Sequence, residues 1–312
     1  MPSKNALYYK QNRLKQLRAF CHTAQTGSIS KAAERLFLSQ PSVTLQIQAL
    51  ERELASDLFE RRGPTIRLTP EGEVLYNLAL PLVQGIDTLQ ENFQAHCGKL
   101  EEGELTIAAG ESAILYILPN PMKRFSDDYP GIRLRLQNVT GRDGLAMLRA
   151  DEVDFAVGSF IDPPDDVSYN PFVCHKPTLI TPLDHPLAQK KALTLEDISP
   201  YGLILPPRHL STWSTVDVAF SDLNIPYTVS LEAGGWEVIK KYVEVGLGIS
   251  IVMDVCLTGE EKLYRYPMDR YLPTRSYGII MRKGKFLSPQ AKRFIDMLDP
   301  RFFTDEELKP CR

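Results

Sequence analysis

The sequence predicts a mixed α/β protein of 312 residues built from three parts. Residues 1–70 show short helical patterns and a basic charge balance. Residues 71–103 indicate a long helix that ends in a hinge, and residues 104–312 alternate strands with helices. Because a chain of this length is expected to form more than one domain, we predict a small helical domain, a linker helix and a larger α/β domain.

The composition is that of an ordinary globular protein, with 43% hydrophobic and 24% charged residues. No apolar run approaches the roughly 18 residues of a membrane span. The N-terminal run MPSKNALYYKQNR lacks the apolar core of a secretory signal. We therefore expect a cytoplasmic protein with no membrane partner.

The net charge of -3 conceals an uneven distribution. Residues 1–70 hold 11 Lys and Arg against 5 Asp and Glu, a balance of +6, which leaves -9 for the rest of the chain. A basic domain on an acidic body is the layout expected of a nucleic-acid-binding protein that has a separate second function.

Three short helices are predicted at the N-terminus. Residues 14–26 place most apolar side chains on one face and stop at Gly27. Ser28 or Ser30 can cap a second helix over 31–37. Ser39 caps a third, in which Pro41 lies in the first turn. The tight turn between the last two predicts a helix-turn-helix.

The third helix has two distinct faces. Val43, Ile47, Leu50 and Leu54 form a narrow apolar stripe. Such an arrangement suits reading base edges in a groove, although a plain solvated face would have a similar composition. The outward face consists of Pro41, Ser42, Thr44, Leu45, Gln48 and Arg52.

A short basic hairpin follows in the run LFERRGPTIRLTPEG, where Gly63 and Pro64 break the chain. It predicts the wing of a winged helix, although an ordinary solvated turn is the alternative. Arginines on a wing enter the minor groove or contact phosphates. The arginines concerned are Arg61, Arg62 and Arg67.

A long helix is predicted from Thr69 to about residue 97, and Pro81 should kink it. Steps of three and four residues make a seam like that of a coiled coil. One chain cannot bury such a seam in a linker, so we expect pairing with a second copy. The seam consists of Leu75, Leu78, Leu82, Ile86, Leu89 and Phe93.

From Glu104 onward, strands and helices alternate. The expected strands are ELTIAAG, GIRLRLQNV, VDFAVG, PTLITPL, YGLILPP, YTVSLEA, GISIVM and RSYGIIMRKG. The expected helices cover residues 114–129, 141–150, 212–222, 235–246 and 289–298.

No enzymatic or metal-binding motif is present. The chain lacks GxSxG, a P-loop, GxGxxG after a strand and HExxH, and its five histidines lack metal-ligand spacing. The five cysteines are far apart and odd in number, which favours free thiols, with Cys174 and Cys256 as candidates for a redox role. We expect no catalytic residues, no metal and no cofactor.

Taken together, the sequence resembles the LysR-type transcriptional regulators along essentially its whole length. The resemblance rests on TGSISKAAERLFLSQPSVTLQIQALERELASDLFERR, LTPEGEVL and VGLGISIVM. Two further runs, LITPLDHPLAQKKALTLEDI and VIKKYVEVGLG, are similar to the branch that contains the cysteine-biosynthesis regulators.

The resemblance implies a DNA-binding transcriptional regulator controlled by a small effector, which binds in a cleft between two subdomains of the periplasmic-binding-protein type. It also implies double-stranded promoter DNA as a partner, a homodimer or homotetramer, and RNA polymerase as a further partner. The implied parts are a winged helix-turn-helix over 1–70, a dimerisation helix and hinge over 71–103, and an effector domain over 104–312, with subdomain I at about 104–174 and 272–312 and subdomain II at about 177–268.

The recognition helix implied by the resemblance spans about Ser39 to Glu51. Many relatives carry Arg or Lys at the position of Leu45, whereas leucine can contact only a thymine methyl group. The implied base-facing positions are Gln40, Pro41, Ser42, Thr44, Leu45 and Gln48.

The effector cleft is expected beyond the carboxyl ends of strands, where helix N-termini present backbone N–H groups. Each hydroxyl there could equally be a helix cap. An inward Glu111 would favour an amine-bearing or neutral ligand over a bare anion, and an outward one would only stabilise its own helix. The expected contacts are Glu111, Ser112, Thr140, Ser211, Thr212, Gly235 and Trp236.

The branch implies sulfate-like anions, sulfur-containing metabolites or amino-acid-like metabolites as effectors. The alternative function is that of a cytoplasmic two-lobed α/β small-molecule-binding protein or enzyme. The missing secretory signal argues against a solute-binding protein, and the missing catalytic motifs argue against an enzyme.

Overall fold

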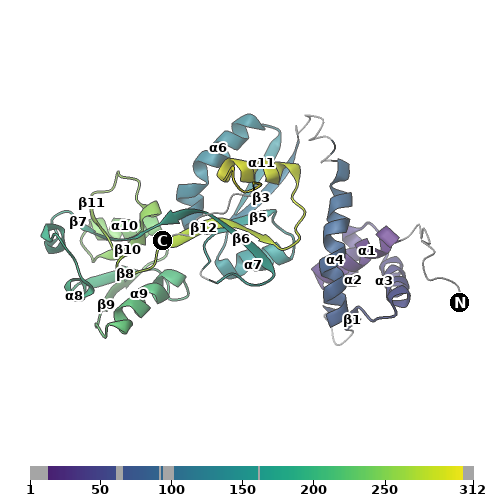
Figure 1. Ribbon diagram of the computed structural model, residues 1–312, viewed down its shortest axis with the longest axis horizontal. Helices are drawn as coiled ribbons and strands as arrows, with labels where there is room; N and C mark the ends of the chain where they lie inside the picture. The colour runs from purple at the N-terminus through teal and green to yellow at the C-terminus, as the bar shows by residue number, and fades with distance from the viewer. Residues whose placement is uncertain (1–12, 61–65, 91–92, 94–101, 161, 305–312) are drawn as a thin grey trace.

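The structure is a computed structural model that describes residues 13–60, 66–90, 93, 102–160 and 162–304. Three bodies lie in a row, namely the N-terminal helical domain with α4, a central body and a distal body (Figure 1). We call the central body lobe I and the distal body lobe II. In the part of the chain that the structure describes, no helix has the length and apolar character needed to cross a bilayer.

The N-terminal domain confirms the predicted helices and their caps. The Ser28 hydroxyl accepts the Lys31 N–H, and the Ser39 hydroxyl accepts the Ser42 N–H. Gly27 follows the first helix with a φ of +60°. The second helix begins two residues earlier than expected because Ser28, and not Ser30, is its cap. The helices are α1 (Arg13–Thr26), α2 (Ile29–Arg35) and α3 (Gln40–Leu54).

A two-stranded antiparallel hairpin, β1 (Phe59–Glu60) and β2 (Arg67–Leu68), follows α3. The tip of the predicted wing, with Arg61 and Arg62, lies outside the described residues. Helix α4 (Pro70–Asp87) then continues through Pro81 to a turn at Thr88, and Leu89, Gln90 and Phe93 beyond that turn are helical again. The rest of the predicted helix, from 94 to about 97, lies outside the described residues.

Lobe I is a five-stranded mixed sheet in the order β4-β3-β5-β12-β6. Strand β3 runs parallel to β4 and β5, and β12 runs antiparallel to β5 and β6. One face packs on α6 (Pro119–Asp128) and α11 (Pro289–Leu298), and the other on α7 (Gly141–Arg149). The strands are β3 (Gly103–Ala109), β4 (Ile132–Asn138), β5 (Phe155–Gly158), β6 (Val167–His175) and β12 (Arg275–Arg282).

The single helix expected over 114–129 is wrong, because it is split in two. A π-helical segment, η1 (Ala113–Ile117), precedes α6, and the Leu118 N–H reaches back to the Ala113 carbonyl at 2.8 Å. The break has a covalent cause. Pro119 and Pro121 have no N–H to donate to the preceding turn, so the regular bonding pattern cannot pass through them.

Lobe II contains an antiparallel sheet, β10-β7-β11, beside a parallel pair, β8-β9, which it meets at a bridge between Leu203 and Ile249. Its strands are β7 (Pro177–Pro182), β8 (Gly202–Leu205), β9 (Thr228–Glu232), β10 (Ser250–Met253) and β11 (Leu263–Pro267). Its helices are η2 (Pro186–Gln189), α8 (Leu195–Ile198), α9 (Ser211–Asp222), α10 (Trp236–Glu244) and η3 (Asp254–Cys256).

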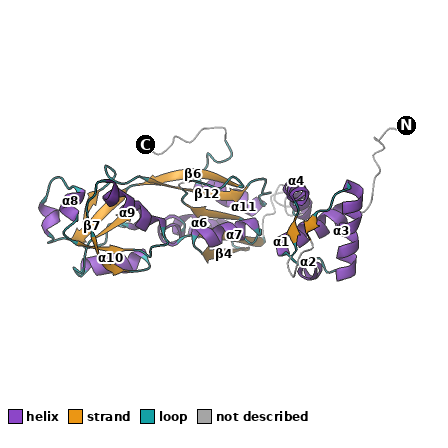
Figure 2. Cartoon of the chain, turned by 90° about the horizontal axis from the view of Figure 1, so that it is seen from below, coloured by secondary structure: helices purple, strands orange, loops and turns teal. Residues whose placement is uncertain are grey.

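The chain crosses between the lobes twice, from β6 to β7 and from β11 to β12, along the side where β6 and β12 run together (Figure 2). The crossings are held side by side, since the Met268 N–H donates to the Pro177 carbonyl at 2.8 Å. Near the same point, His175 Nδ1 lies 2.7 Å from Asp254 Oδ1. These two segments therefore form the covalent hinge of the lobes.

The N-terminal domain contacts lobe I through a buried ion cluster. Asp151 binds Lys285 Nζ at 2.8 Å and Arg282 Nη2 at 3.5 Å. Gln25 of α1 donates to the same carboxylate at 3.1 Å, and Arg282 donates to Gln84 of α4 at 3.3 Å. We call these five residues the interdomain cluster. It attaches both α1 and α4 to one end of the lobe I sheet.

Candidate functional site

Helix α3 presents the predicted outward face to solvent and buries its stripe only in part. Val43, Ile47 and Leu50 are buried against α1 and α2. The inward position expected for Leu54 is wrong, because this last helical residue extends past the core and is exposed. Leu45, at 61% exposure, lies on the outward face and is free to contact a thymine methyl group.

Hydrogen bonds order the polar side chains of this face. The Ser39 and Ser42 hydroxyls lie 2.9 Å apart, and the Thr44 hydroxyl donates to the Gln40 carbonyl at 3.0 Å. Each hydroxyl oxygen keeps lone pairs that can accept from a base. The predicted residues Ser39, Gln40, Pro41 and Arg52 of α3 are exposed, Ser42, Thr44 and Gln48 are half-buried, and Arg67 is exposed on β2.

The predicted seam, which we call the α4 seam, is exposed in the single chain, both on α4 and at Leu89 and Phe93 beyond its last residue. Its opposite face, with Ala79, Leu80 and Val83, is buried in the N-terminal domain. Leu75 is the exception in the predicted seam, since it is half-buried against that domain. The exposed members are Leu78, Leu82, Ile86, Leu89 and Phe93.

A cleft of about 540 Å³ is lined by residues of both lobes. Three helices, α7, α9 and α10, begin at this cleft, so their partly positive ends face it. The structure brings together here all the predicted effector contacts, which are Glu111, Ser112, Thr140, Ser211, Thr212, Gly235 and Trp236.

The alternative role of the hydroxyls as helix caps is wrong, since neither η1, α7 nor α9 has a side-chain cap bond. The Thr140 hydroxyl instead donates to Asp143 Oδ2 at 2.6 Å. Ser112 and Thr212 are buried at the cleft wall. These hydroxyls therefore line the cleft without being used to begin a helix.

Sequence reasoning missed Arg275, which is the first residue of β12 and lines the cleft. Its Nη1 donates to the Thr212 hydroxyl at 3.4 Å. Among the described residues, no carboxylate lies within 4.0 Å of its guanidinium. No motif marks a lone arginine at a strand start, and only the fold brings it opposite α9.

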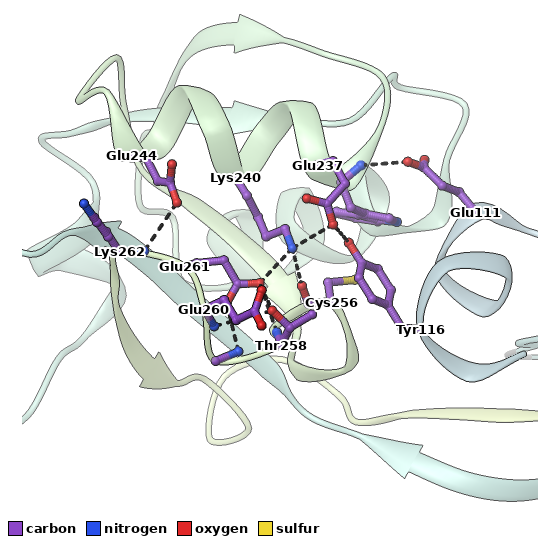
Figure 3. Close-up of polar contacts among 12 residues, drawn as sticks. Glu111, Tyr116, Glu237, Lys240, Glu244, Cys256, Thr258, Glu260, Glu261 and Lys262 are labelled. Atoms are coloured by element: carbon purple, nitrogen blue, oxygen red, sulfur yellow. Dashed lines mark hydrogen bonds and ion pairs between the residues drawn. The ribbon is translucent and has the colours of Figure 1, made fainter. Parts of the chain in front are cut away.

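The structure gives Glu111 a position that was not anticipated. Its Oε1 accepts the backbone N–H of Trp236 at 3.1 Å, across the cleft from lobe I to lobe II (Figure 3). The carboxylate thus faces the cleft and also stabilises a helix N-terminus, but that helix is α10 of the opposite lobe.

The cysteines give no support for thiol redox chemistry at Cys256. Burial raises the pKa of the Cys21 and Cys256 thiols to about 12, so both stay protonated at neutral pH. Cys174 is disulfide-bonded, so the expectation of free thiols is wrong there. Among the described residues, no group of three His, Cys, Asp or Glu side chains is placed to hold a metal ion.

Two regions of the chain match one known protein family. Residues 14–73 match the bacterial regulatory helix-turn-helix protein of the lysR family, and residues 98–302 match the LysR substrate binding domain. The chain belongs to the LysR family. This LysR-family protein is therefore a DNA-binding transcriptional regulator with an effector-binding domain, and it is not an enzyme.

Curated relatives agree with this membership over nearly the full length. The RuBisCO operon transcriptional regulator of Allochromatium vinosum is 30% identical over 285 residues, covering 90% of this chain and 93% of that protein. The regulator CysB of Burkholderia cenocepacia is 28% identical over 281 residues, covering 88% and 89%. The similarity to the cysteine-regulator branch is thereby supported.

Solved structures share the architecture of this LysR-family chain. A full-length OxyR variant from Pseudomonas aeruginosa has a TM-score of 0.65 at 24% identity and covers 93% of this chain and 94% of its own. The cofactor-binding domain of the Cbl transcriptional regulator has a TM-score of 0.59 at 28% identity and covers 64% and 89%. The order of a helix-turn-helix domain followed by a two-lobed α/β domain is confirmed.

Proposed function

We propose that the effector of this regulator is an organic anion that binds between the lobes, with Arg275 as its anchor. The observation that carries the proposal is the guanidinium of Arg275, which lines the cleft without a carboxylate partner among the described residues. The Thr212 hydroxyl beside it and the N-termini of α7 and α9 add polar groups that favour an anion.

The chemical class that we propose for the effector follows from the resemblance to the cysteine-regulator branch. A cleft of about 540 Å³ is in the range that holds a small metabolite. Sulfur-containing or amino-acid-like carboxylates combine the required anionic group with hydrogen-bonding atoms for Ser112 and Thr140. Contacts from both lobes would let such a ligand favour one lobe arrangement over another.

The test is a thermal-shift screen of sulfur-containing and amino-acid carboxylates, followed by calorimetry on the compounds that bind. Arg275→Met should weaken binding about 10- to 100-fold, the effect of losing one hydrogen bond to a charged group. Arg133→Met, on the exposed edge of lobe I, serves as the matched control. Unchanged affinity in Arg275→Met would place the anchor elsewhere.

We further propose that the outward face of α3 reads promoter DNA in the major groove and that the wing arginines bind the backbone. Gln48→Ala should relax base preference at one position, at a cost of about 1–3 kcal/mol for the preferred site. Arg67→Ala should weaken binding to all duplexes and reduce the salt dependence. Equal losses on every sequence for Gln48→Ala would argue against base reading.

The exposed α4 seam supports the proposal of a homodimer, with a homotetramer as the larger assembly. Two recognition helices joined by this seam could bind two half-sites about one helical turn apart. Contact with RNA polymerase stays a prediction.

A further inference from the structure

A second connection joins the lobes apart from the hinge, at the N-terminus of α10 (Figure 3). Glu111, just after β3, accepts the Trp236 N–H at 3.1 Å. Tyr116 of η1 donates its hydroxyl to Glu237 Oε1 at 2.5 Å. Both bonds run from lobe I to the first turn of the same lobe II helix. We call these four residues the interlobe contact.

A buried lysine holds the lobe II side of the interlobe contact in place. Lys240, only 3% exposed, donates to Glu237 at 2.9 Å, to Glu261 at 2.8 Å and to the Cys256 carbonyl at 2.8 Å. Its ammonium also lies 5.2 Å from the centre of the Tyr116 ring. All three N–H donors of the lysine are therefore used, and the first turn of α10 has a fixed position.

The backbone around Gly235 lets the Glu111 carboxylate come close to α10. Gly235 has a φ of +91°, and a Cβ built there would lie 3.2 Å from Glu111 Oε1. As the N-cap of α10, Gly235 has no side chain to accept the first N–H groups. A carboxylate from the opposite lobe performs this role instead.

The position of Glu111 also decides which anions the cleft can hold. Its carboxylate already accepts from the N-terminus of α10, which would otherwise be one of the sites for an anion in the cleft. Asp143 adds a second negative charge, against the single Lys or Arg side chain, Arg275, among the described lining residues. A bare oxyanion therefore meets two carboxylates and one guanidinium.

We propose that the Glu111 carboxylate determines effector specificity. It excludes fully deprotonated inorganic oxyanions such as sulfate, and it selects an organic anion that binds Arg275 and offers a hydrogen-bond donor to the second Glu111 oxygen. The inference rests on the proposed function of the cleft. An amino-acid-like ligand has both groups, a carboxylate for the guanidinium and an ammonium for the carboxylate. Free sulfate has no hydrogen-bond donor for Glu111 at neutral pH, and the carboxylate of Glu111 keeps it from the N-terminus of α10.

The experiment is calorimetric titration of the full chain with sodium sulfate, against sodium chloride at equal ionic strength. Wild type should show no saturable sulfate binding at millimolar concentration. Glu111→Ala should gain it, by about tenfold or more in affinity, because the N–H groups of α10 become available to the anion. Glu111→Gln keeps an oxygen for Trp236 and should fall between the two, which also provides a conservative variant with the fold intact.

Two control variants test whether a loosened interlobe contact or a general loss of negative charge would explain the gain in sulfate binding equally well. Tyr116→Phe removes the other interlobe hydrogen bond and leaves Glu111 in place, so it should gain no sulfate binding. Asp143→Asn removes one negative charge from the same cleft without freeing α10, so it should gain less than Glu111→Ala. An equal gain in Asp143→Asn, a gain in Tyr116→Phe, or no gain in Glu111→Ala would each overturn the proposal.

Failure of the specificity role of Glu111 can be distinguished from failure of the proposed cleft site. If organic carboxylates bind wild type and are lost in Arg275→Met while Glu111→Ala gains no sulfate, only the specificity role of Glu111 fails. If Arg275→Met leaves the organic ligands bound, the proposed site fails first.

Discussion

Replacing Asp151 should destabilise the protein more than any exposed charge substitution. The Asp151 side chain is 8% exposed and lies between Arg282 at 7% and Lys285 at 11%. Asp151→Asn would leave two cations in the buried interdomain cluster without their shared anion. Asparagine is the chosen replacement because Asp151 has a φ of +54°, a conformation that asparagine tolerates better than alanine.

The size of the effect follows from burial. Removing one partner of a buried ion pair costs about 3–5 kcal/mol because the remaining charge stays desolvated. Lys285 keeps the Val153 carbonyl at 3.4 Å and Arg282 keeps the Lys283 carbonyl at 3.2 Å, so we expect the lower end, about 3 kcal/mol. For a domain of this size that corresponds to a fall in Tm of about 6–12 °C.

The assay is differential scanning calorimetry of the full chain, with Asp166→Asn as the matched control. Asp166 pairs with Arg149 at 2.6 Å in the same lobe, but the two side chains are 47% and 50% exposed. Such an exposed pair contributes at most about 1 kcal/mol. Equal Tm values for the two variants would refute the reasoning from burial.

Three further outcomes are expected. The double variant Leu82→Asp and Leu89→Asp should sediment as a monomer and lose binding to two half-sites, because both leucines are exposed on the α4 seam. Gly72→Ala should destabilise the N-terminal domain by about 1–3 kcal/mol in denaturant titration, since its Cβ would lie 2.1 Å from the Leu58 carbonyl oxygen. Burial acts to raise the pKa of Glu261, but bonds from Lys240 and from backbone N–H groups lower it to about 2, below its usual 4.5. The stability that comes from this lowered pKa is therefore present above about pH 4.5 and lost as the pH falls toward 2, and Glu261→Gln should lose less over that interval in acid denaturation.

Local signals explain what the sequence predicted correctly in the fold. Ser28 and Ser39 cap helices, and Gly27 ends one. Each acts on backbone groups within a few residues, so a short run of sequence is enough to predict its effect. Strand β6 was not anticipated, because its run VSYNPFVCH mixes polar residues and a proline with apolar ones. It is a strand because it pairs with β12 along its length, a partner about a hundred residues away in the sequence.

In the cleft, too, residues with a local sequence signal could be predicted, whereas residues positioned by distant parts of the chain could not. Ser112 and Thr212 could be predicted because they follow strands at turns that a two-lobed α/β fold brings together. Arg275 could not, because its role depends on a hinge that places the start of β12 next to α9. The partner of Glu111 lies 125 residues further along the chain, and no periodicity connects the two.

Strand β12 has Arg275 at one end, in the cleft, and Arg282 at the other, in the interdomain cluster. Successive strand residues point to opposite faces, so inserting one residue between these arginines would turn one of them to the wrong side of the sheet. Inserting two would restore the faces but shift one end by about 7 Å. Natural variation and protein engineering alike can therefore change side chains between these two arginines more readily than the length of the strand.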